Sequence, residues 1–139
     1  MMNYKKIAVA IDFSKQSLLA LDRAIRIAVN NDAELLLVNV IDTKTFGSIA
    51  AYDLTYAAQL KQESTEKLQQ LKAQAESDGV KHVTFLLAEG SPKKILTTLA
   101  ETELIICGET GYNAIEKLML GSVAERVVRY APYDVLIVR

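Results

Sequence analysis

The sequence predicts an α/β fold, a doubly wound parallel sheet of five strands with helices on both faces. Three observations lead to this prediction. Five short apolar runs are separated by segments with helical spacing. Most of these runs are continuous rather than alternating, which is typical of strands buried on both faces. Strands and helices alternate along the chain in the order β-α-β-α-β-α-β-α-β, which favours a parallel sheet with right-handed crossovers.

The first elements are defined by apolar runs and their boundaries. Residues 7–11 form a buried strand that ends at Asp12. Ser14 is suited to cap the next helix, in which residues 18–29 repeat apolar side chains at helical spacing. Residues 30–32 end that helix, and residues 34–40 predict the second strand.

The middle of the chain combines a loop, a long helix and a third strand. Residues 42–50 have no clear period and are expected to form a loop. Residues 51–77 are rich in good helix formers, and Gly79 is expected to stop this helix. Residues 80–88 predict the third strand. The inner stripe of the long helix is predicted to contain Leu60, Leu68, Leu71 and Ala75.

The last elements begin with Ser91 and Pro92, which predict a helix start because serine caps and proline suits the first turn. Residues 103–107 predict the fourth strand, residues 122–130 the last helix with Ser122 as a cap, and residues 135–138 the fifth strand. The apolar face of the helix that begins at Pro92 is predicted to contain Ile95, Leu96, Leu99 and Ala100.

Composition narrows the class of protein. Residues 1–139 fit one domain, and the hydrophobic fraction of 50% is ordinary for a globular chain. A net charge of −1 gives no basic field for nucleic acid or for an anionic membrane. The single cysteine, Cys107, excludes an internal disulfide and favours a reducing compartment. No run of about 18 apolar residues is present, so we expect a cytoplasmic protein.

In a doubly wound sheet, ligands bind beyond the carboxyl ends of the strands, where the strand order reverses. Residues 12–14, 40–42, 88–91 and the loop from Gly108 all leave predicted carboxyl ends. If the first and fourth strands flank the reversal, Asp12 faces the Gly108 loop. Gly121 and Ser122 would then present backbone N–H groups at a helix start, which favours an anion.

Common phosphate-binding and catalytic motifs are absent from the sequence. The chain lacks both GxxxxGK[ST] and GxGxxG. His82 has no partner that would suggest a metal site or a catalytic triad, so we expect no catalytic or metal-ligating residues. The remaining pattern is Gly108-x2-Gly111-x9-Gly121-Ser122, between a predicted strand and a predicted helix.

This glycine pattern, followed by VAERVVRYAPYDVLIVR, resembles the nucleotide-binding loop of the universal stress protein family. The similarity covers the whole chain, including the first strand ending in Asp12, the segment VNV, and the segments EGSP and ELIICG. The resemblance implies a sheet of order 3-2-1-4-5 and ATP binding. It also implies a homodimer with a stress-related, switch-like role and weak or absent hydrolysis.

The resemblance also implies a set of nucleotide-binding residues. Asp12 and the backbone of Val40 would lie at the adenosine, and Gly108 and Gly111 near the ribose and α-phosphate. Gly121, Ser122 and Val123 would hold the phosphates. Around these positions, the predicted site also includes Ala10, Ser14 and Gly90, at or near the strand ends.

The loop departs from the family pattern at its start. A basic residue that is common there is replaced by Thr110, and Glu109 adds an acid. The loop would therefore depend on amide dipoles and a divalent cation such as Mg²⁺ bridging phosphate oxygens. We expect Mg-dependent binding with no strong preference for a triphosphate over a diphosphate.

Several alternatives remain open. Asp12 is expected either to contact the nucleotide or a metal, or to cap a helix beside Ser14. The protein is interpreted as an ATP-binding regulator, with two rivals: a slow Mg-dependent ATPase, and an interaction module whose loop, through Glu109 and Thr110, no longer binds nucleotide. Residues 134–139 are predicted to pair with a second copy, because an open apolar edge strand invites pairing.

Overall fold

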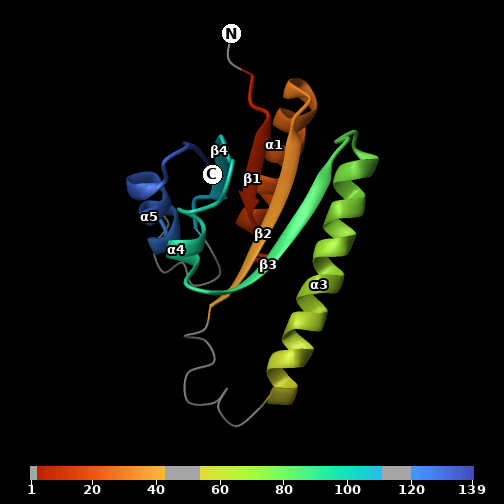
Figure 1. Ribbon diagram of the computed structural model, residues 1–139, viewed down its shortest axis with the longest axis vertical. Coiled ribbons are helices and arrows are strands. Elements are labelled where there is room, and N and C mark those ends of the chain that lie inside the picture. The colour runs from red at the N-terminus through yellow and green to blue at the C-terminus, as the bar shows by residue number, and fades with distance from the viewer. Residues whose placement is uncertain (1–2, 43–53, 111–119) are drawn as a thin grey trace.

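The structure, a computed structural model, describes residues 3–42, 54–110 and 120–139. These residues form a parallel sheet of five strands with the order β3-β2-β1-β4-β5, as predicted (Figure 1). The strands are β1 (Lys6–Ala10), β2 (Glu34–Asp42), β3 (Val83–Gly90), β4 (Leu104–Gly108) and β5 (Asp134–Val138). The helices are α1 (Lys15–Asn31), α3 (Leu54–Ser77), α4 (Pro92–Ile95) and α5 (Ser122–Tyr130). The predicted loop lies almost wholly outside the described residues, and Gly111 lies outside them too.

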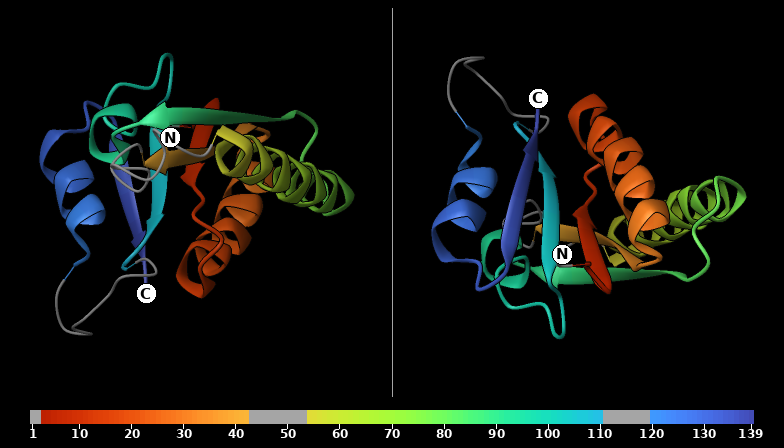
Figure 2. Two further views of the ribbon diagram at one scale, coloured as in Figure 1. Left: turned by 90° about the horizontal axis from the view of Figure 1, so that it is seen from below. Right: turned by 90° about the horizontal axis from the view of Figure 1, so that it is seen from above.

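Helices cover both faces of the sheet, so the apolar core has two parts (Figure 2). On one face, α1 and α3 pack through residues such as Leu21 and Leu68 against Ile7 and Val9 of β1. On the other face, Leu96 and Val127 pack against Ala8, at the side of α4 and α5. The alternation of β1 side chains between two apolar layers explains why its sequence is a continuous apolar run.

The connection from β1 to α1 is held by local hydrogen bonds. The Oδ1 atom of Asp12 accepts a hydrogen bond from the Ser14 amide at 2.9 Å. Ser14 is the N-cap, as predicted, and its Oγ accepts from the Ser17 amide at 3.2 Å. Asp12 therefore forms the turn before the helix rather than capping α1 itself. The helix ends at Asn31, and its C-cap is Asp32, a left-handed residue with φ 53°.

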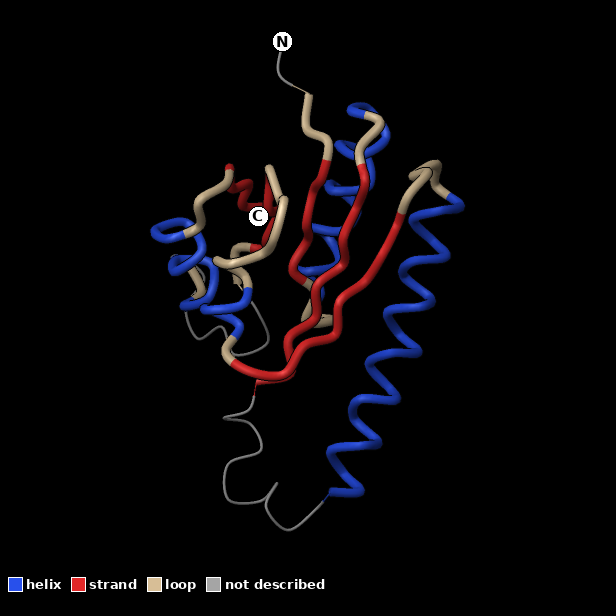
Figure 3. Tube along the Cα trace, in the orientation of Figure 1, coloured by secondary structure: helices blue, strands red, loops and turns tan. Residues whose placement is uncertain are grey.

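Helix α4 is much shorter than the sequence predicts, because it ends at Ile95 (Figure 3). The Tyr133 hydroxyl lies between the carbonyl of Leu96, to which it donates at 2.5 Å, and the amide of Leu99, from which it accepts at 3.1 Å. A side chain that inserts into the helical hydrogen-bond pattern interrupts it. Ser91 occupies the N-cap position but makes no side-chain capping bond, so that part of the prediction is wrong.

Helix α5 has the predicted bounds but a different cap. Gly121, not Ser122, is the N-cap, and no side-chain hydrogen bond caps the helix. Ser122 is the first helical residue. The Glu125 amide donates to the Gly121 carbonyl oxygen at 2.9 Å, so the amides of Ser122, Val123 and Ala124 precede the first bond inside the helix.

Strand β5 is an edge of the sheet, as predicted, and pairs only with β4 among the described strands. The Asp134 amide donates to Glu103, and the Val138 carbonyl accepts from Glu109. Since the backbone groups of a strand point alternately to either side, those of Val135 and Ile137 point to the open edge. No helix within the described ranges is long and apolar enough to cross a membrane.

Candidate functional site

A cavity of about 350 Å³ lies beyond the carboxyl ends of β1, β2 and β4, at the reversal of strand order. Helices α4 and α5 complete its walls. The cavity brings together seven of the residues predicted from the sequence: Ala10, Asp12, Val40, Gly108, Gly121, Ser122 and Val123. These seven residues come from four separate segments, spread over more than 100 residues of the chain. The topology of the sheet brings them together.

Three predicted residues are not part of the described cavity wall. Ser14 is only 5% exposed, and its hydroxyl caps α1. Gly90 ends β3 with φ 145°, and a Cβ there would lie 3.2 Å from Cδ1 of Ile95. Glycine is therefore required at position 90 by the turn from β3 to α4. Gly111 lies outside the described residues.

Gly108 lines the cavity, but the structure shows a second reason for glycine here. A Cβ at Gly108 would lie 2.9 Å from both the carbonyl carbon and the oxygen of Gln16. These are backbone atoms in the first turn of α1. The end of β4 thus approaches α1 more closely than any side chain allows.

The beginning of α5 supplies backbone donors to the cavity. Gly121, Ser122, Val123 and Ala124 all line it. The Gly121 amide donates to the Glu109 carbonyl oxygen at 2.9 Å, which ties the helix start to the loop after β4. The positive end of the helix dipole and the first-turn amides of α5 therefore lie at the wall of the cavity, where they favour an anion.

The charged side chains of the described cavity wall are both acidic, Asp12 and Asp42. No lysine or arginine is among the described lining residues. Glu109, which the sequence suggested would add an acid near the phosphates, is not a lining residue, whereas Thr110 is. Within the described wall, the acidic side chains thus follow the end of β1 and end β2.

Part of the cavity wall is apolar. Val38, Leu96 and Cys107 line it and belong to the core on the side of α4 and α5. Cys107 is 3% exposed, and burial raises the pKa of its thiol to about 12. Such a thiol stays protonated at neutral pH and acts as a packed apolar side chain.

Sequence reasoning missed several lining residues. They are Ile11, Ser17, Val38, Asp42, Pro92, Leu96, Cys107, Thr110 and Ala124. A signal for Val38 was present, because residues two apart on a strand share a face and Val40 was already predicted. Pro92 and Leu96 could not be found this way, because their place depends on how α4 packs.

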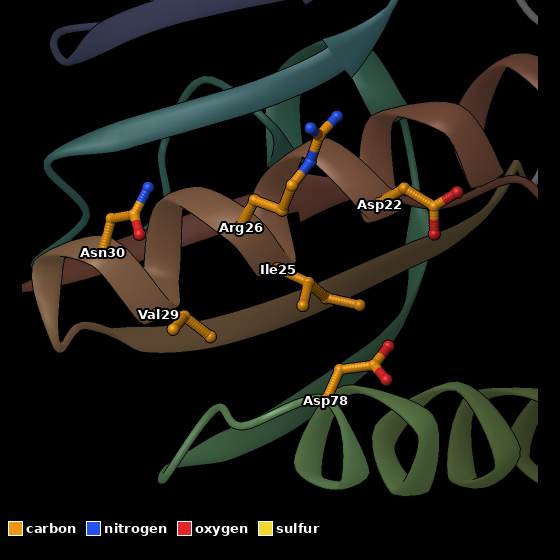
Figure 4. A pocket seen from close by; sticks show the side chains of 6 residues that line it. All are labelled: Asp22, Ile25, Arg26, Val29, Asn30 and Asp78. Atoms are coloured by element: carbon orange, nitrogen blue, oxygen red, sulfur yellow. The ribbon is translucent and has the colours of Figure 1, made fainter.

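A second hollow, of about 460 Å³, lies between α1 and the end of α3 and is lined by Asp22, Ile25, Arg26, Val29, Asn30 and Asp78 (Figure 4). Ile25 and Val29 point toward the Asp78 side, whereas Arg26 and Asn30 point the other way. None of the predicted site residues is there. Although its volume is larger, this hollow lies away from the carboxyl ends of the strands and lacks convergent donors.

Metal-ligating side chains do not gather elsewhere in the described ranges. Groups of three or more His, Cys, Asp or Glu that could hold a metal ion are absent from those ranges. His82 is exposed. A divalent cation in the cavity would therefore take most of its ligands from phosphate oxygens and water, with Asp12 and Asp42 as the carboxylates within the wall.

The sequence profile described as "Universal stress protein family" matches residues 3–139, nearly the whole chain. The chain belongs to the universal stress protein family. Among its relatives, a protein from Staphylococcus saprophyticus named as a universal stress protein is 42% identical over 143 residues, covering 100% of this chain and 86% of the relative. A similarly named protein from Staphylococcus epidermidis is 43% identical with the same coverage.

Solved structures of this family share the fold. The universal stress protein UspA from Lactobacillus plantarum superimposes with a TM-score of 0.86 at 24% identity, over 100% of both chains. A universal stress protein crystallised in complex with cAMP has a TM-score of 0.72 at 28% identity, covering 99% of this chain and 98% of that one. The family member in that second structure binds an adenine nucleotide.

Proposed function

We propose that this universal stress protein is a stress-related regulator that binds ATP or a related adenine nucleotide in the cavity beyond β1, β2 and β4. The observation that carries the proposal is the composition of the cavity wall. Backbone amides at the start of α5 offer donors for phosphate oxygens. Val38, Leu96 and Cys107 offer an apolar surface for a base. The relative that binds cAMP supports the same ligand class.

Within this proposal, Asp12 and the Val40 backbone contact the adenosine, and Gly121, Ser122 and Val123 hold the phosphates. Mg²⁺ accompanies the nucleotide, because the only charged side chains of the described wall are two carboxylates. When bound, the ion supplies charge neutralisation between these acids and the phosphate oxygens. Asp12 keeps one carboxylate oxygen engaged with the Ser14 amide, which fixes the orientation of the group.

The protein binds ATP rather than turning it over rapidly. Fast phosphoryl transfer depends on cationic groups that stabilise charge on the transferred phosphoryl. The described wall offers amide dipoles but no lysine or arginine for this purpose. A steady-state hydrolysis assay on the wild type and on Asp12→Ala separates this function from slow Mg-dependent hydrolysis, since only an ATPase loses turnover with Asp12.

The protein acts as a cytoplasmic homodimer, in which β5 pairs with β5 of a second copy. Support comes from the position of β5 at an edge and from its half-buried apolar side chains at Val135, Leu136 and Ile137. A charge at Leu136 or Ile137 is expected to give monomer or aggregate in light scattering. A dimer unchanged by both substitutions would rule out this interface.

The decisive experiment is mass spectrometry of the small molecules released when freshly purified protein is denatured, followed by calorimetric titration with ATP, ADP, AMP and cAMP. We expect an adenine nucleotide in the released fraction and saturable binding in the titration. A protein that releases none and binds none of the four would be an interaction module instead.

A further inference from the structure

Tyr133, just before β5, lies outside the cavity wall but contacts the element that forms part of it. Its hydroxyl donates to the Leu96 carbonyl at 2.5 Å and accepts from the Leu99 amide at 3.1 Å. These two backbone groups are three residues apart and would otherwise pair with each other in a tight turn. The hydroxyl therefore takes the place of a hydrogen bond within the chain that follows α4.

The α4 segment needs such support because it is too short to be rigid alone. The helix has one turn, Pro92–Ile95, and its N-cap Ser91 makes no side-chain capping bond. After it, the chain continues in tight turns: the Thr97 and Thr98 amides donate to the Lys94 and Ile95 carbonyls, and the hydroxyls of the same two threonines donate back to the Lys93 and Lys94 carbonyls. An isolated turn of this length has no cooperative helical stability. The Leu96 amide donates to the Pro92 carbonyl at 2.9 Å, whereas the Leu96 carbonyl is held by Tyr133, from the far end of the sequence.

Leu96 connects these contacts to the cavity. Its side chain is 3% exposed and lines the cavity together with Pro92, four residues earlier. Its carbonyl oxygen is the acceptor of the Tyr133 hydroxyl. The Tyr133 ring itself packs into the core on the same side, with Cys107 and Val127. Burial is the main cause that raises the pKa of the Tyr133 phenol, so the hydroxyl stays protonated and able to donate at neutral pH.

We propose that Tyr133 is a positioning residue of the cavity, which holds Leu96 and Pro92 in place as the apolar wall against the base and ribose of a bound nucleotide. This inference rests on the proposed function. An aliphatic side chain stabilises the base or the sugar and adds nothing to a phosphate oxygen. Loss of the Tyr133 hydroxyl should therefore weaken the adenosine part of the ligand selectively.

The test compares Tyr133→Phe with the matched control Tyr130→Phe, which removes a hydroxyl from a tyrosine that is 57% exposed on α5. Calorimetry measures the dissociation constants of ATP and of adenosine for each variant. Tyr133→Phe should weaken both ligands by the same factor, about two- to tenfold, as expected for one hydrogen-bonding group. The ratio of the two constants should stay at its wild-type value, and Tyr130→Phe should change neither constant.

Two further readouts separate positioning from general stability. Amide hydrogen exchange at Leu99 should become faster in Tyr133→Phe, because its acceptor is gone. Leu96→Ala should reproduce the equal loss for ATP and adenosine, and the double variant should lose less than the sum, because both changes act on one wall.

Each of the other outcomes contradicts the inference. A folded Tyr133→Phe protein with wild-type affinity for adenosine would overturn it, and so would a loss confined to ATP. A Tyr133→Phe chain that fails to fold would assign the hydroxyl to stability alone. If the wild-type protein binds neither ATP nor adenosine, the proposed function fails, and this inference falls with it.

Discussion

Gly108 shows how a single residue can serve the fold at a candidate ligand site. It ends β4 directly against the first turn of α1, where an added Cβ would lie 2.9 Å from the Gln16 carbonyl carbon and oxygen. A backbone carbonyl within a helix cannot turn aside as a flexible side chain can. Any larger residue must therefore shift α1 relative to the sheet, whether or not a ligand is present.

We expect Gly108→Ala to lower the free energy of unfolding of the ligand-free protein by about 1–3 kcal/mol, the usual cost of overpacking. Urea denaturation followed by circular dichroism measures this change. The accompanying loss of nucleotide affinity should be secondary to the shift of α1. A variant of unaltered stability that no longer binds nucleotide would instead assign Gly108 to the ligand alone.

Ser14 and Ser122 form a matched pair of serines at helix starts with different roles. Ser14 Oγ caps α1 through the Ser17 amide, whereas Ser122 follows the cap of α5 and makes no capping bond. Ser14→Ala should cost about 1 kcal/mol of stability. Ser122→Ala should change stability by less than about 0.5 kcal/mol, as for other exposed sites.

In ligand binding the two serines are expected to differ the other way, so that the substitution at Ser122 has the larger effect. Calorimetric titration should show weaker ATP binding for Ser122→Ala, since Ser122 lines the cavity. Ser14→Ala should bind ATP as the wild type does, once its lower stability is allowed for. Equal destabilisation by both substitutions would mean that the Ser122 hydroxyl caps α5 in solution.

These residues also show what local sequence can reveal. Ser14 was predicted as a cap because serine followed by a helical pattern is a local signal. Gly121 and Ser122 carry the same kind of signal, and only the backbone path decides which of the two is the cap. The close approach of Gly108 to Gln16 joins residues 92 positions apart in the chain, so no local pattern reports it.

At the scale of elements, strands and long helices were predictable because burial on two faces leaves continuous apolar runs and helical stripes. Helix α4 was not, although Ile95, Leu96, Leu99 and Ala100 have helical spacing. Beyond Ile95 the backbone forms tight turns, and Tyr133, a residue of a distant segment, takes up the Leu96 carbonyl and the Leu99 amide. The predicted apolar stripe of α3 is largely correct, with Leu68 and Ala75 fully buried and Leu60 and Leu71 partly buried.

Strand β5 allows a test of dimerisation that leaves its ladder with β4 intact. Because the Ile137 amide points to the open edge, Ile137→Pro removes a donor available to a second copy and none that β4 uses. Light scattering should show a monomer. Ile137→Ala, which also loses the side chain but keeps the amide, should remain a dimer. If both variants are dimers, pairing through β5 is excluded.

At the scale of the whole molecule, the sheet topology places two kinds of electrostatic environment at one cavity. The ends of β1 and β2 bring the carboxylates of Asp12 and Asp42, and α5 brings the positive end of its dipole. The near-neutral net charge of −1 gives no long-range attraction for an anion. Binding of a charged nucleotide therefore depends on this local arrangement and on any cation that accompanies it.

This arrangement predicts how ATP binding depends on Mg²⁺. In the wild type, Mg²⁺ should strengthen ATP binding, with ATP and ADP bound about equally, because the cation screens the phosphates from Asp12 and Asp42. Asp12→Asn keeps an oxygen that can accept from the Ser14 amide but removes one negative charge. Titration without Mg²⁺ should therefore show tighter ATP binding for Asp12→Asn than for the wild type, and the gain from adding Mg²⁺ should be smaller.

The control is Asp22→Asn, an equal change of charge on the exposed face of α1. It should alter neither the ATP affinity without Mg²⁺ nor the gain from adding Mg²⁺. A wild-type protein that strongly prefers ATP in the absence of Mg²⁺ would require a cationic group that the described wall does not contain, and would contradict this account of the cavity.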